Sequence, residues 1–368
     1  MSLTIVDSLD EKAWRQFVDE QPQGNIFHTP EMFQVFARAA GHRPMLLAAV
    51  GDHGEVLALL LPVQVTLRDG LFRRLTTRSI AYGSVLCAPG PVGREALSFL
   101  LRTYIREAGH AALFSELRNL SDLSAIQPML DESGFAYEEH LDYLIDLNCL
   151  PDQVLQNMGP RTRKLIRRAL RKGNVVVEQA TGRNQIIDWY DLVRETYKAA
   201  RVPLADRSLF EAAFDILHPR GMIKFWLARI GTRYAAASAE LVYKDVMYGW
   251  YGGMDRAFAE DLPGELLMWR ILEWGAQAGY KTYDFGGAGK PGEAYGVRDF
   301  KAKFGGRLVC FGRNVCIHAP GLLRLSTLGY RILTSRFTLD QRFSSPKSEA
   351  HDSIQRDPCA QLGGSNEK

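Results

Sequence analysis

The chain has 368 residues, of which 46% are hydrophobic, 10% aromatic and 24% charged. This composition is typical of globular domains and excludes a wholly disordered chain, a collagen-like repeat and a small disulfide-rich protein. The formal net charge of +3, from 45 Lys and Arg against 42 Asp and Glu, is too small to identify a nucleic-acid-binding protein by itself. The length is sufficient for two or three domains.

Cysteine usage and hydropathy bear on metal binding and on the compartment. The five cysteines are scattered, without a C-x-x-C pair, so neither a zinc site nor a disulfide framework is predicted. The first residues run directly into Asp7 and Asp10 rather than into a secretion signal, and we expect a cytoplasmic protein. The most apolar stretch, residues 56–65, contains Pro62 and has about half of the roughly 20 residues that a membrane helix needs. At most a peripheral membrane contact is therefore expected.

The first half of the chain contains a recognisable order of elements. Residues 46–61 hold two apolar runs separated by a polar, Gly-containing turn, which predicts a β-hairpin. A Pro-Gly-Pro turn at 89–91 precedes the amphipathic stretch 95–108, which predicts a helix that ends before Gly109. The apolar run 111–114 then predicts a returning strand.

The second half repeats this order. Residues 226–243 again hold two apolar runs around a glycine, and the Pro-Gly turn 263–264 precedes the amphipathic stretch 265–278. Gly279 stands at the same spacing from its helix as Gly109 does, and the strand-like run 282–285 follows. In both halves the glycine is typical of the position that ends a helix.

The repetition predicts an internal duplication with an α+β fold. We expect two tandem domains, 1–148 and 149–318, each with a mixed, mainly antiparallel sheet flanked by helices. Chance similarity between two α+β halves is the alternative, and the agreement in order and spacing argues against it. A C-terminal helix is expected within 319–337, and a disordered tail over 338–368, where apolar residues are sparse.

A basic helix is predicted over residues 160–173, at the start of the second domain. The segment contains no acid, has an apolar stripe at helical spacing and ends at Gly173. A solvated helix face is one interpretation. The other is a face for phosphate, from RNA, a sugar-nucleotide diphosphate or an anionic lipid headgroup. Two rows of cations stand at i, i+4 and i+8, namely Arg163, Arg167 and Arg171, and Lys164, Arg168 and Lys172.

Glycine pairs follow three predicted strands or segments of the second half. They occur in Tyr-Gly-Gly at 251–253, in Asp-Phe-Gly-Gly at 284–287 and in the segment 300–306, which ends in Phe-Gly-Gly. Each pair can serve a turn, and together they indicate a place where the backbone closely approaches a ligand.

These pieces resemble the FemAB family, the aminoacyl-tRNA-dependent transferases that extend the bridge peptide of peptidoglycan. The resemblance is carried by the Y-G-G strand, the helix ending at Gly279, the D-F-G-G strand and the F-K-x-x-F-G-G segment. It covers most of residues 25–312 and implies two GNAT-like acyltransferase domains, with a donor of the aminoacyl-tRNA or acyl-CoA type.

The chain also departs from the family pattern. Members that act on the bridge peptide carry R-G-P-x-x-D in the first domain, whereas residues 89–94 read P-G-P-V-G-R and lack both the Arg and the Asp. The turn 262–267 instead resembles the P-G-x-x-L of broader GNAT-like acyltransferases from cell-envelope and exopolysaccharide gene sets. The Gln/Arg-x-x-Gly-x-Gly/Ala pattern of ordinary acetyl-CoA enzymes is absent as well.

Roles follow for individual residues. The resemblance implies that Lys301 contacts phosphate or developing negative charge, and Pro263-Gly264 opens a helix whose free N–H groups could cradle phosphate. Glu240 and Asp284 are candidate bases, with a turn cap as the alternative for Asp284. The candidate site therefore comprises Lys301, Asp284 and Glu240 as catalytic groups, no metal ligand, and as substrate-binding groups Tyr251, Gly252, Pro263, Gly264, Gly286, Gly287, Tyr295, Phe300, Arg163, Lys164 and Arg167.

We therefore expect an acyltransferase that forms an amide bond on a cell-envelope, peptidoglycan-type precursor, with aminoacyl-tRNA as donor and no permanently bound cofactor or metal. The first alternative is an acyl-CoA-dependent N-acyltransferase that acts on an amino sugar or an exopolysaccharide precursor. The second is a non-catalytic RNA-binding or scaffold protein that uses the basic helix. DNA is not an expected partner, and the oligomeric state stays open.

Overall fold

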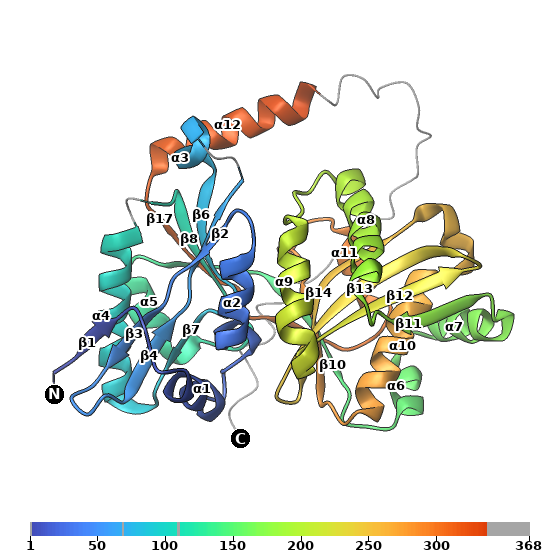
Figure 1. Cartoon of the computed structure of the whole chain (residues 1–368), viewed down its shortest axis with the longest axis horizontal. Helices are drawn as coiled ribbons and strands as arrows, with labels where there is room; N and C mark the ends of the chain where they lie inside the picture. The colour runs from blue at the N-terminus through green and yellow to red at the C-terminus, as the bar shows by residue number, and fades with distance from the viewer. Residues whose placement is uncertain (1, 68–69, 109–110, 337–368) are drawn as a thin grey trace. The chain divides into compact units, whose positions relative to one another are not determined.

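The computed structural model describes residues 2–67, 70–108 and 111–336, without the side chains of residue 71 and residues 329–336. The chain divides into two compact units (Figure 1). Unit 1 consists of residues 1–24, 41–138 and 312 onward, and unit 2 of residues 25–40 and 139–311. The predicted tail, 338–368, lies outside the described residues.

Unit 1 holds a four-stranded and a six-stranded sheet. The first has the order β1 (Thr4–Val6), β3 (Leu47–Val50), β4 (Val56–Leu60), β7 (Val85–Cys87). The second has the order β2 (His42–Pro44), β5 (Val63–Thr66), β6 (Thr77–Ala81), β8 (Phe114–Arg118), β17 (Arg313–Ile317), β9 (Ala136–Glu138). Its helices are α1 (Glu11–Glu20), α3 (Arg73–Thr76), α4 (Gly90–Ala108), α5 (Gln127–Glu132) and α12 (Pro320–Arg336), with 3-10 turns η2 (Gly70–Phe72) and η3 (Ser124–Ile126).

The predicted hairpin and helix of unit 1 are both present. Strands β3 and β4 pair antiparallel, and α4 buries Leu97 and Leu100 in the core of the unit. The helix starts at Gly90, earlier than the predicted residue 95, because Pro91 fits the first turn of a helix, where its missing N–H is not needed. From α4, Tyr104 hydrogen-bonds the hydroxyl groups of two serines on the sheet beneath it.

Unit 2 is built on one seven-stranded sheet of order β11-β12-β13-β14-β15-β10-β16. Its strands are β10 (Leu141–Asp146), β11 (Val175–Gln179), β12 (Ile223–Ile230), β13 (Arg233–Tyr243), β14 (Val246–Met254), β15 (Thr282–Gly287) and β16 (Arg307–Cys310). Its helices are α2 (Pro30–Arg38), α6 (Pro151–Asn157), α7 (Pro160–Lys172), α8 (Arg183–Ala200), α9 (Arg207–Leu217), α10 (Pro263–Gln277) and α11 (Gly296–Ala302), with 3-10 turns η1 (Ile26–His28), η4 (His218–Arg220) and η5 (Arg256–Asp261).

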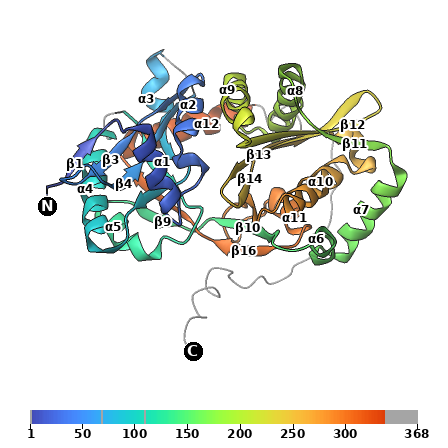
Figure 2. The same ribbon diagram turned by 60° about the horizontal axis from the view of Figure 1, so that its bottom comes forward.

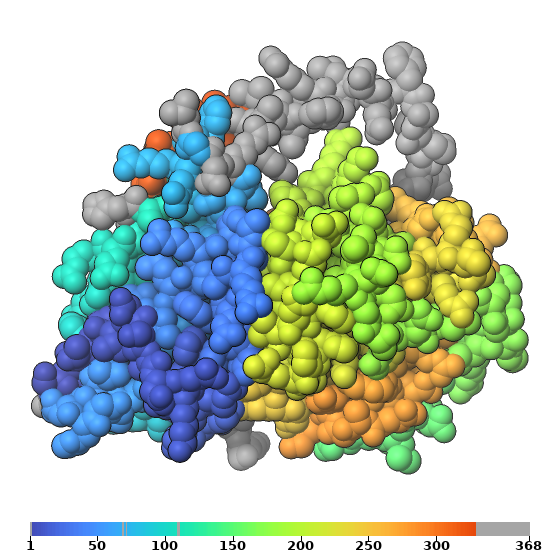
Figure 3. Space-filling model, viewed as in Figure 1, coloured from blue at the N-terminus to red at the C-terminus, as the bar shows by residue number. Residues whose placement is uncertain are grey.

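Helices cover both faces of this sheet. Figure 2 shows α8 and α9 on one face and α10 on the other, and in Figure 3 the yellow-green side chains of α8 and α9 form a continuous surface. On the α8 face, the indole of Trp189 donates a hydrogen bond to the carbonyl of Ser238, 3.0 Å away. On the α10 face, Ile166 of α7 joins the same hydrophobic core as Ile271 of α10. The predicted basic helix is thus an amphipathic helix packed on the core.

Two strands join sheets other than those that the predicted boundaries at 148 and 318 assign them to. Strand β10 lies within residues 1–148 but pairs with β15 and β16 of unit 2. Strand β17 lies within residues 149–318 but pairs with β8 and β9 of unit 1. Alternating burial fixes which face of a strand is apolar, and it carries no information about which sheet supplies the hydrogen-bonding partner. Among the described helices, none combines the length and the apolar character required to cross a bilayer.

A glycine substitution tests the contact between α8 and the sheet. A Cβ at Gly253 of β14 would lie 2.7 Å from Thr196 Oγ1 and 2.9 Å from Val193 Cα, so Gly253→Ala must push the helix away. We expect a loss of about 1–3 kcal/mol in the free energy of unfolding, measured in urea. Gly296→Ala is the matched control, because a Cβ at Gly296 meets no atom within 4 Å. Equal unfolding free energies for the two variants would contradict this packing.

Candidate active site

The centre of the site is a place where two parallel strands separate. Strands β14 and β15 pair only from Val246 opposite Thr282 to Tyr248 opposite Asp284. Beyond these pairs β14 continues to Met254 and β15 to Gly287. Ligands in sheets of this kind bind outside the carboxyl ends of parallel strands, where neighbouring connections diverge. The candidate residues of the second half gather around this opening.

A buried carboxylate, Glu240, stands on β13 beside the opening. Its side chain is 0% exposed. It accepts a short hydrogen bond from the hydroxyl group of Ser238, and one of 2.9 Å from the hydroxyl group of Tyr283 on β15. Gly249 lies directly opposite Glu240 on β14, and a Cβ there would be 2.7 Å from the Tyr283 hydroxyl. Glycine at this position therefore makes room for the Tyr283–Glu240 hydrogen bond.

Burial raises the pKa of Glu240 to about 7. The hydrogen bonds from Ser238 and Tyr283 and the charge of Lys301 act in the opposite direction and do not offset the loss of solvation. A carboxyl group with a pKa near neutrality can both accept and return a proton under physiological conditions.

A second pair of buried carboxyl groups joins β10 to β15. Burial raises the pKa of Asp142 well above its ordinary value, and the charge of Asp284 and the hydrogen bond to it add to the effect. Burial also raises the pKa of Asp284, whose Oδ1 accepts a 2.7 Å hydrogen bond from the backbone N–H of Gly286. The two carboxyl groups interact with each other, so they titrate as a pair.

Lys301 connects these groups to the end of β15. It lies on α11 and not on a strand, and it is buried. Its Nζ donates to the carbonyl oxygens of Phe285, Gly286 and Gly287 at 2.7, 2.8 and 2.9 Å. An ammonium group has three donors, so a contact between Lys301 and a substrate requires the exchange of one of these bonds. Burial lowers the pKa of Lys301, while the charges of Asp142, Asp284 and Glu240 raise it.

The N-terminus of α10 faces the same strand. Its cap residue, Leu262, has a left-handed backbone with φ of 57° and supplies no side-chain hydrogen bond to the helix. Within the described residues, the N–H groups of Gly264 and Glu265 have no recorded acceptor. A Cβ at Gly264 would lie 3.1 Å from Met254 Sδ at the end of β14 and 4.0 Å from Phe300 on α11. Two open amides at a helix N-terminus are suited to bind an anion.

Several glycines of the three pairs are required by packing within unit 2. The sequence alone did not distinguish this role from the close approach of a ligand to the backbone. Gly253 accommodates α8, as described above. Gly305 and Gly306 have positive φ angles, and Cβ atoms there would lie 2.7 Å from the carbonyl oxygens of Asn157 and Leu144. Gly286 also has a positive φ, and a Cβ there would lie 3.1 Å from the Tyr248 hydroxyl, while the carbonyl of Gly287 accepts from Lys301. Gly252 remains beside the opening, where a Cβ would lie 3.3 Å from the carbonyl oxygen of Ala237 and 3.6 Å from Ser238 Oγ.

The other predicted substrate residues are three aromatic residues and the cations of α7. Tyr251 faces an aromatic cluster, with its ring centroid 4.9 Å from that of Phe210 on α9 and 5.8 Å from that of Tyr197 on α8. Phe300 stacks edge-on against Phe304 at 5.1 Å, close to the start of α10. Tyr295 is the residue before α11 and is 41% exposed.

The cations of α7 lie on the side of the helix opposite its buried residues, Thr162, Ile166 and Ala169. Arg163 is held against α6, where it donates to the carbonyl of Gln156 at 2.5 Å, and Lys172 pairs with Asp261 in η5. The exposed cations without an ion pair among the described residues are Arg161, Lys164, Arg167, Arg168 and Arg171.

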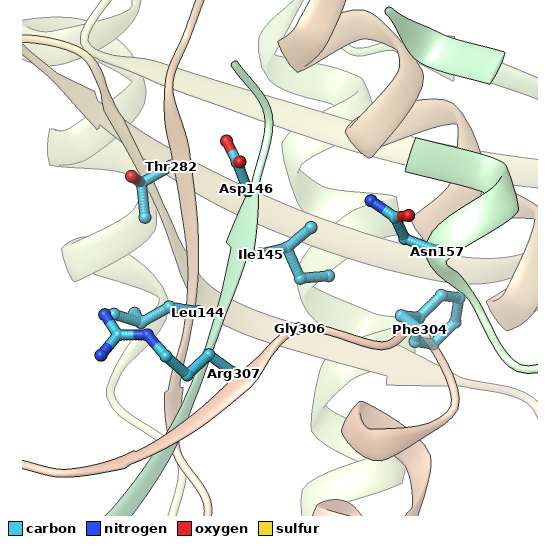
Figure 4. Close-up of a pocket in the computed structure, with 8 residues that line it drawn as sticks. All are labelled: Leu144, Ile145, Asp146, Asn157, Thr282, Phe304, Gly306 and Arg307. Carbon is cyan, nitrogen blue, oxygen red and sulfur yellow. The ribbon is translucent and has the colours of Figure 1, made fainter. Parts of the chain in front are cut away.

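Unit 2 also contains a cavity of about 370 Å³, separate from this cluster of carboxyl groups (Figure 4). It lies along β10 and β16, and neither Glu240, Asp284 nor Lys301 lines it. We do not assign it to the active site. Its lining residues are Leu144, Ile145, Asp146, Asn157, Thr282, Phe304, Gly306 and Arg307.

Four members of the site did not emerge from the sequence as candidates: Asp142, Ser238, Gly249 and Tyr283. A signal existed for Asp142, because an acid at a buried position of the strand-like run Leu-Asp-Tyr-Leu-Ile-Asp, residues 141–146, is unusual without a partner. The sequence did not show that β10 pairs with β15 of unit 2, and this pairing is what brings Asp142 to Asp284.

Comparison with known proteins agrees with this architecture. Residues 160–302 match the model of the family described as acetyltransferase (GNAT) domain. A crystal structure of FemX is similar with a TM-score of 0.65 and 18% identity, over 88% of this chain and 99% of that one. No curated protein sequence is similar to the chain.

Two further solved structures share the two-domain fold. The C-terminal domain of a putative lysylphosphatidylglycerol synthetase from Agrobacterium fabrum gives a TM-score of 0.56 and 14% identity, over 87% of this chain and 95% of that one. A tandem GNAT protein from the clavulanic acid biosynthesis pathway gives 0.55 and 12%, over 86% and 99%. The α+β fold with two GNAT-like domains and the resemblance to Fem-type proteins are thereby confirmed at the level of fold.

The raised pKa of Glu240 predicts a pH dependence of stability. Because the folded-state pKa of about 7 lies above the unfolded value of about 4.3, the stabilising contribution is complete below pH 4.3 and is lost as the pH rises through 7. We expect the free energy of unfolding of the wild type to fall by on the order of 3 kcal/mol between these pH values, and Glu240→Gln to abolish this fall. Urea unfolding at pH 5 and pH 8 measures both. Glu195→Gln, at an exposed position of α8, is the control. Parallel pH curves for Glu240→Gln and the wild type would contradict the assignment.

Proposed function

We propose that unit 2 catalyses acyl transfer from a carrier-linked donor to an amine of a cell-envelope precursor, with aminoacyl-tRNA as the donor. The observation that carries the proposal is the separation of β14 from β15 beside the open N-terminus of α10. A phosphate of the donor binds at Gly264, and the acyl group extends along β14 toward Glu240. A cytoplasmic location follows from the donor, since charged tRNA and acyl-CoA are intracellular compounds.

The face of β14 that points toward α10 provides the path. Met254 touches the start of α10, Gly252 lies opposite Ser238, and Gly249 lies opposite Glu240. Five residues of extended strand separate Gly249 from Met254, which is about 16 Å at 3.3 Å per residue. Tyr283 fills the space beside Gly249, whereas Gly252 leaves this face open next to Ser238, so an extended acyl carrier can lie against β14 between Met254 and Ser238.

Ser238 is the member of the hydrogen-bond network that can receive the proton. It is 8% exposed, whereas Glu240 is 0% and Tyr283 1% exposed. In the proposed step the acceptor amine attacks the acyl carbonyl carbon, a C–N bond forms and the bond from that carbon to the carrier oxygen or sulfur breaks. The amine proton passes to Ser238 Oγ as the Ser238 proton moves to Glu240, and the leaving group takes a proton back.

Lys301 acts in this scheme as a positioning residue. Its three hydrogen bonds fix the last carbonyl groups of β15, and its positive charge offsets three buried carboxyl groups. The electrostatic role in the reaction that the resemblance implied for Lys301 is thus exerted through the strand end. Direct contact with phosphate is not needed for it.

The basic helix favours tRNA over CoA as the donor. The five unpaired cations of α7 span eleven residues, from Arg161 to Arg171, or about 15 Å of helix. The helix ends at Lys172, which pairs with Asp261 just ahead of the start of α10 at Pro263. A row of cations that leads to a helix N-terminus suits a polyphosphate chain longer than a pyrophosphate.

The known neighbours support an envelope substrate. FemX and the putative lysylphosphatidylglycerol synthetase share the fold, and the second has a lipid named in its description. The tandem GNAT neighbour is described as without AcCoA, and this keeps an acyl-CoA-dependent N-acyltransferase as the second candidate. A non-catalytic RNA-binding role is the third.

A donor-consumption assay tests the proposal. The full chain is incubated separately with a pool of aminoacyl-tRNAs and with a set of acyl-CoAs, in the presence of amine-bearing envelope precursors, and loss of each donor is followed. We expect consumption of aminoacyl-tRNA and formation of an amide product. Consumption of acyl-CoA alone would support the second candidate, and tRNA binding without turnover would support the third.

The contribution of α7 is tested by its salt dependence. We expect Arg167→Gln with Arg171→Gln to weaken tRNA binding and to reduce the slope of log K against log salt by about 2, since each lost phosphate contact lowers it by about 1. Acyl-CoA binding should stay unchanged. Arg102→Gln with Arg106→Gln, at the same i, i+4 spacing on α4 of unit 1, is the matched control. An unchanged slope would exclude α7 from the tRNA contact.

A further inference from the structure

The six-stranded sheet of unit 1 carries a group of arginines on one face. Strand β6 runs parallel to β8, and β8 pairs antiparallel with β17. Side chains alternate between the two faces of these strands. One face carries Ser79 and Ser115, whose hydroxyl groups bond Tyr104 of α4. The opposite face carries Arg78 of β6, Glu116 and Arg118 of β8, and Arg313 of β17.

Glu116 is the anion at the centre of this group. Its Oε1 accepts from Arg118 Nε at 2.6 Å and from Arg313 Nη1 at 3.2 Å. Burial by itself raises the pKa of Glu116, but the charges of Arg118 and Arg313, the hydrogen bond from Arg118 and the charge of Arg78 lower it to about 2. The carboxyl group is therefore ionised at every physiological pH.

The arrangement concentrates positive charge. Arg118 and Arg313 stand directly opposite each other in the β8–β17 ladder. Like charges at directly opposed positions destabilise a sheet, and both guanidinium groups depend on the same oxygen atom of Glu116 to offset their repulsion. Glu138 stands opposite Arg313 on β9, at the exposed edge of the group. The Arg118 guanidinium is further held 4.9 Å from the ring centroid of Tyr82.

Arg78 adds a third guanidinium group to this face. It is half-buried, and no ion pair within 4 Å is recorded for it among the described residues. Its Nε is fully buried and has no hydrogen-bond partner there. A buried donor without an acceptor costs about 1–3 kcal/mol, and such a group in a native protein commonly indicates a bound water or ion.

We propose that Arg78, Arg118 and Arg313 form a binding site for a phosphate group, and that this phosphate belongs to the acceptor substrate. Guanidinium groups match phosphate oxygens with paired, charge-assisted hydrogen bonds. A phosphate beside Arg78 supplies the acceptor that its Nε lacks and relieves the repulsion among the three cations. Glu116 is the anion that offsets the charges of Arg118 and Arg313 before the ligand arrives, and it competes with the phosphate for them.

The assignment to the acceptor rests on the proposed function, because envelope precursors are carried on phosphate-bearing compounds. Phosphate binding itself does not depend on it. The shared chemistry is a phosphate ester or diphosphate, and its source is either a sugar nucleotide or a lipid headgroup. Binding is therefore tested with inorganic pyrophosphate, with UDP-N-acetylglucosamine and with vesicles containing phosphatidylglycerol, each measured against the full chain.

Calorimetric titration of variants tests the site. We expect Arg78→Gln to weaken binding of the preferred probe by about tenfold to a hundredfold, the range for hydrogen bonds to charged groups. Glu116→Gln is expected to strengthen binding, because it removes the competing anion. The control, Arg102→Gln on an exposed face of α4, should leave affinity unchanged. A merely structural group would instead lose stability in both Arg78→Gln and Glu116→Gln without these opposed changes in affinity.

The outcomes are separable. Absence of binding to all three probes, or equal affinities of Arg78→Gln and Arg102→Gln, would overturn the site. If Arg78→Gln does not fold, Arg78→Lys is used instead, because it keeps the charge. A smaller loss of affinity in Arg78→Lys, with a retained rise of Tm on adding pyrophosphate, supports the site. Unchanged affinity overturns it. Phosphate binding that depends on Arg78, in a protein that consumes neither class of donor, would contradict the proposed function and leave this site standing.

Discussion

The arrangement of unit 2 around its site depends on the ammonium group of Lys301. It donates to three consecutive carbonyl oxygens at the end of β15 and lies among three buried carboxyl groups. Without this cation, the carbonyl groups would lack donors where β15 leaves β14, and the carboxyl groups would lack their counter-charge. This contact fixes the end of β15 beside the opening between the two strands, and the charge of Lys301 limits the rise in the pKa of Glu240 that burial causes.

Sequence patterns were sufficient for part of the fold. Helices α8 and α9 were not predicted, and the strand expected at residues 111–114 lies at Phe114–Arg118. The hairpins and the two long amphipathic helices are present, and the basic helix ends at Gly173, whose φ is 66°. These features are local, since they depend on residues three or four apart or on a single glycine. The start of α4 was placed late because Pro91 was interpreted as part of a turn. Long-range pairing was beyond such patterns, as β10 and β17 illustrate.

The site was predicted in part for the same reason. Lys301, Glu240 and Asp284 were named from the resemblance and from a carboxylate in an apolar strand, and the structure brings all three together. Their partners, Ser238, Tyr283 and Asp142, have residue types that are common in strands, and only the pairing of three strands reveals them. Tyr251 and Gly253 were singled out for a ligand, yet the surroundings of each are aromatic rings or a helix backbone of the same unit.

The placement of β17 determines when unit 1 can be completed during synthesis. This strand lies between β8 and β9 in the sheet, although its residues, Arg313–Ile317, follow all of unit 2 in the chain. A growing polypeptide usually folds its N-terminal part first. The sheet of unit 1 therefore lacks the strand that joins β8 to β9 until residue 317 has been synthesised, so unit 2 has the opportunity to fold before the sheet of unit 1 is complete.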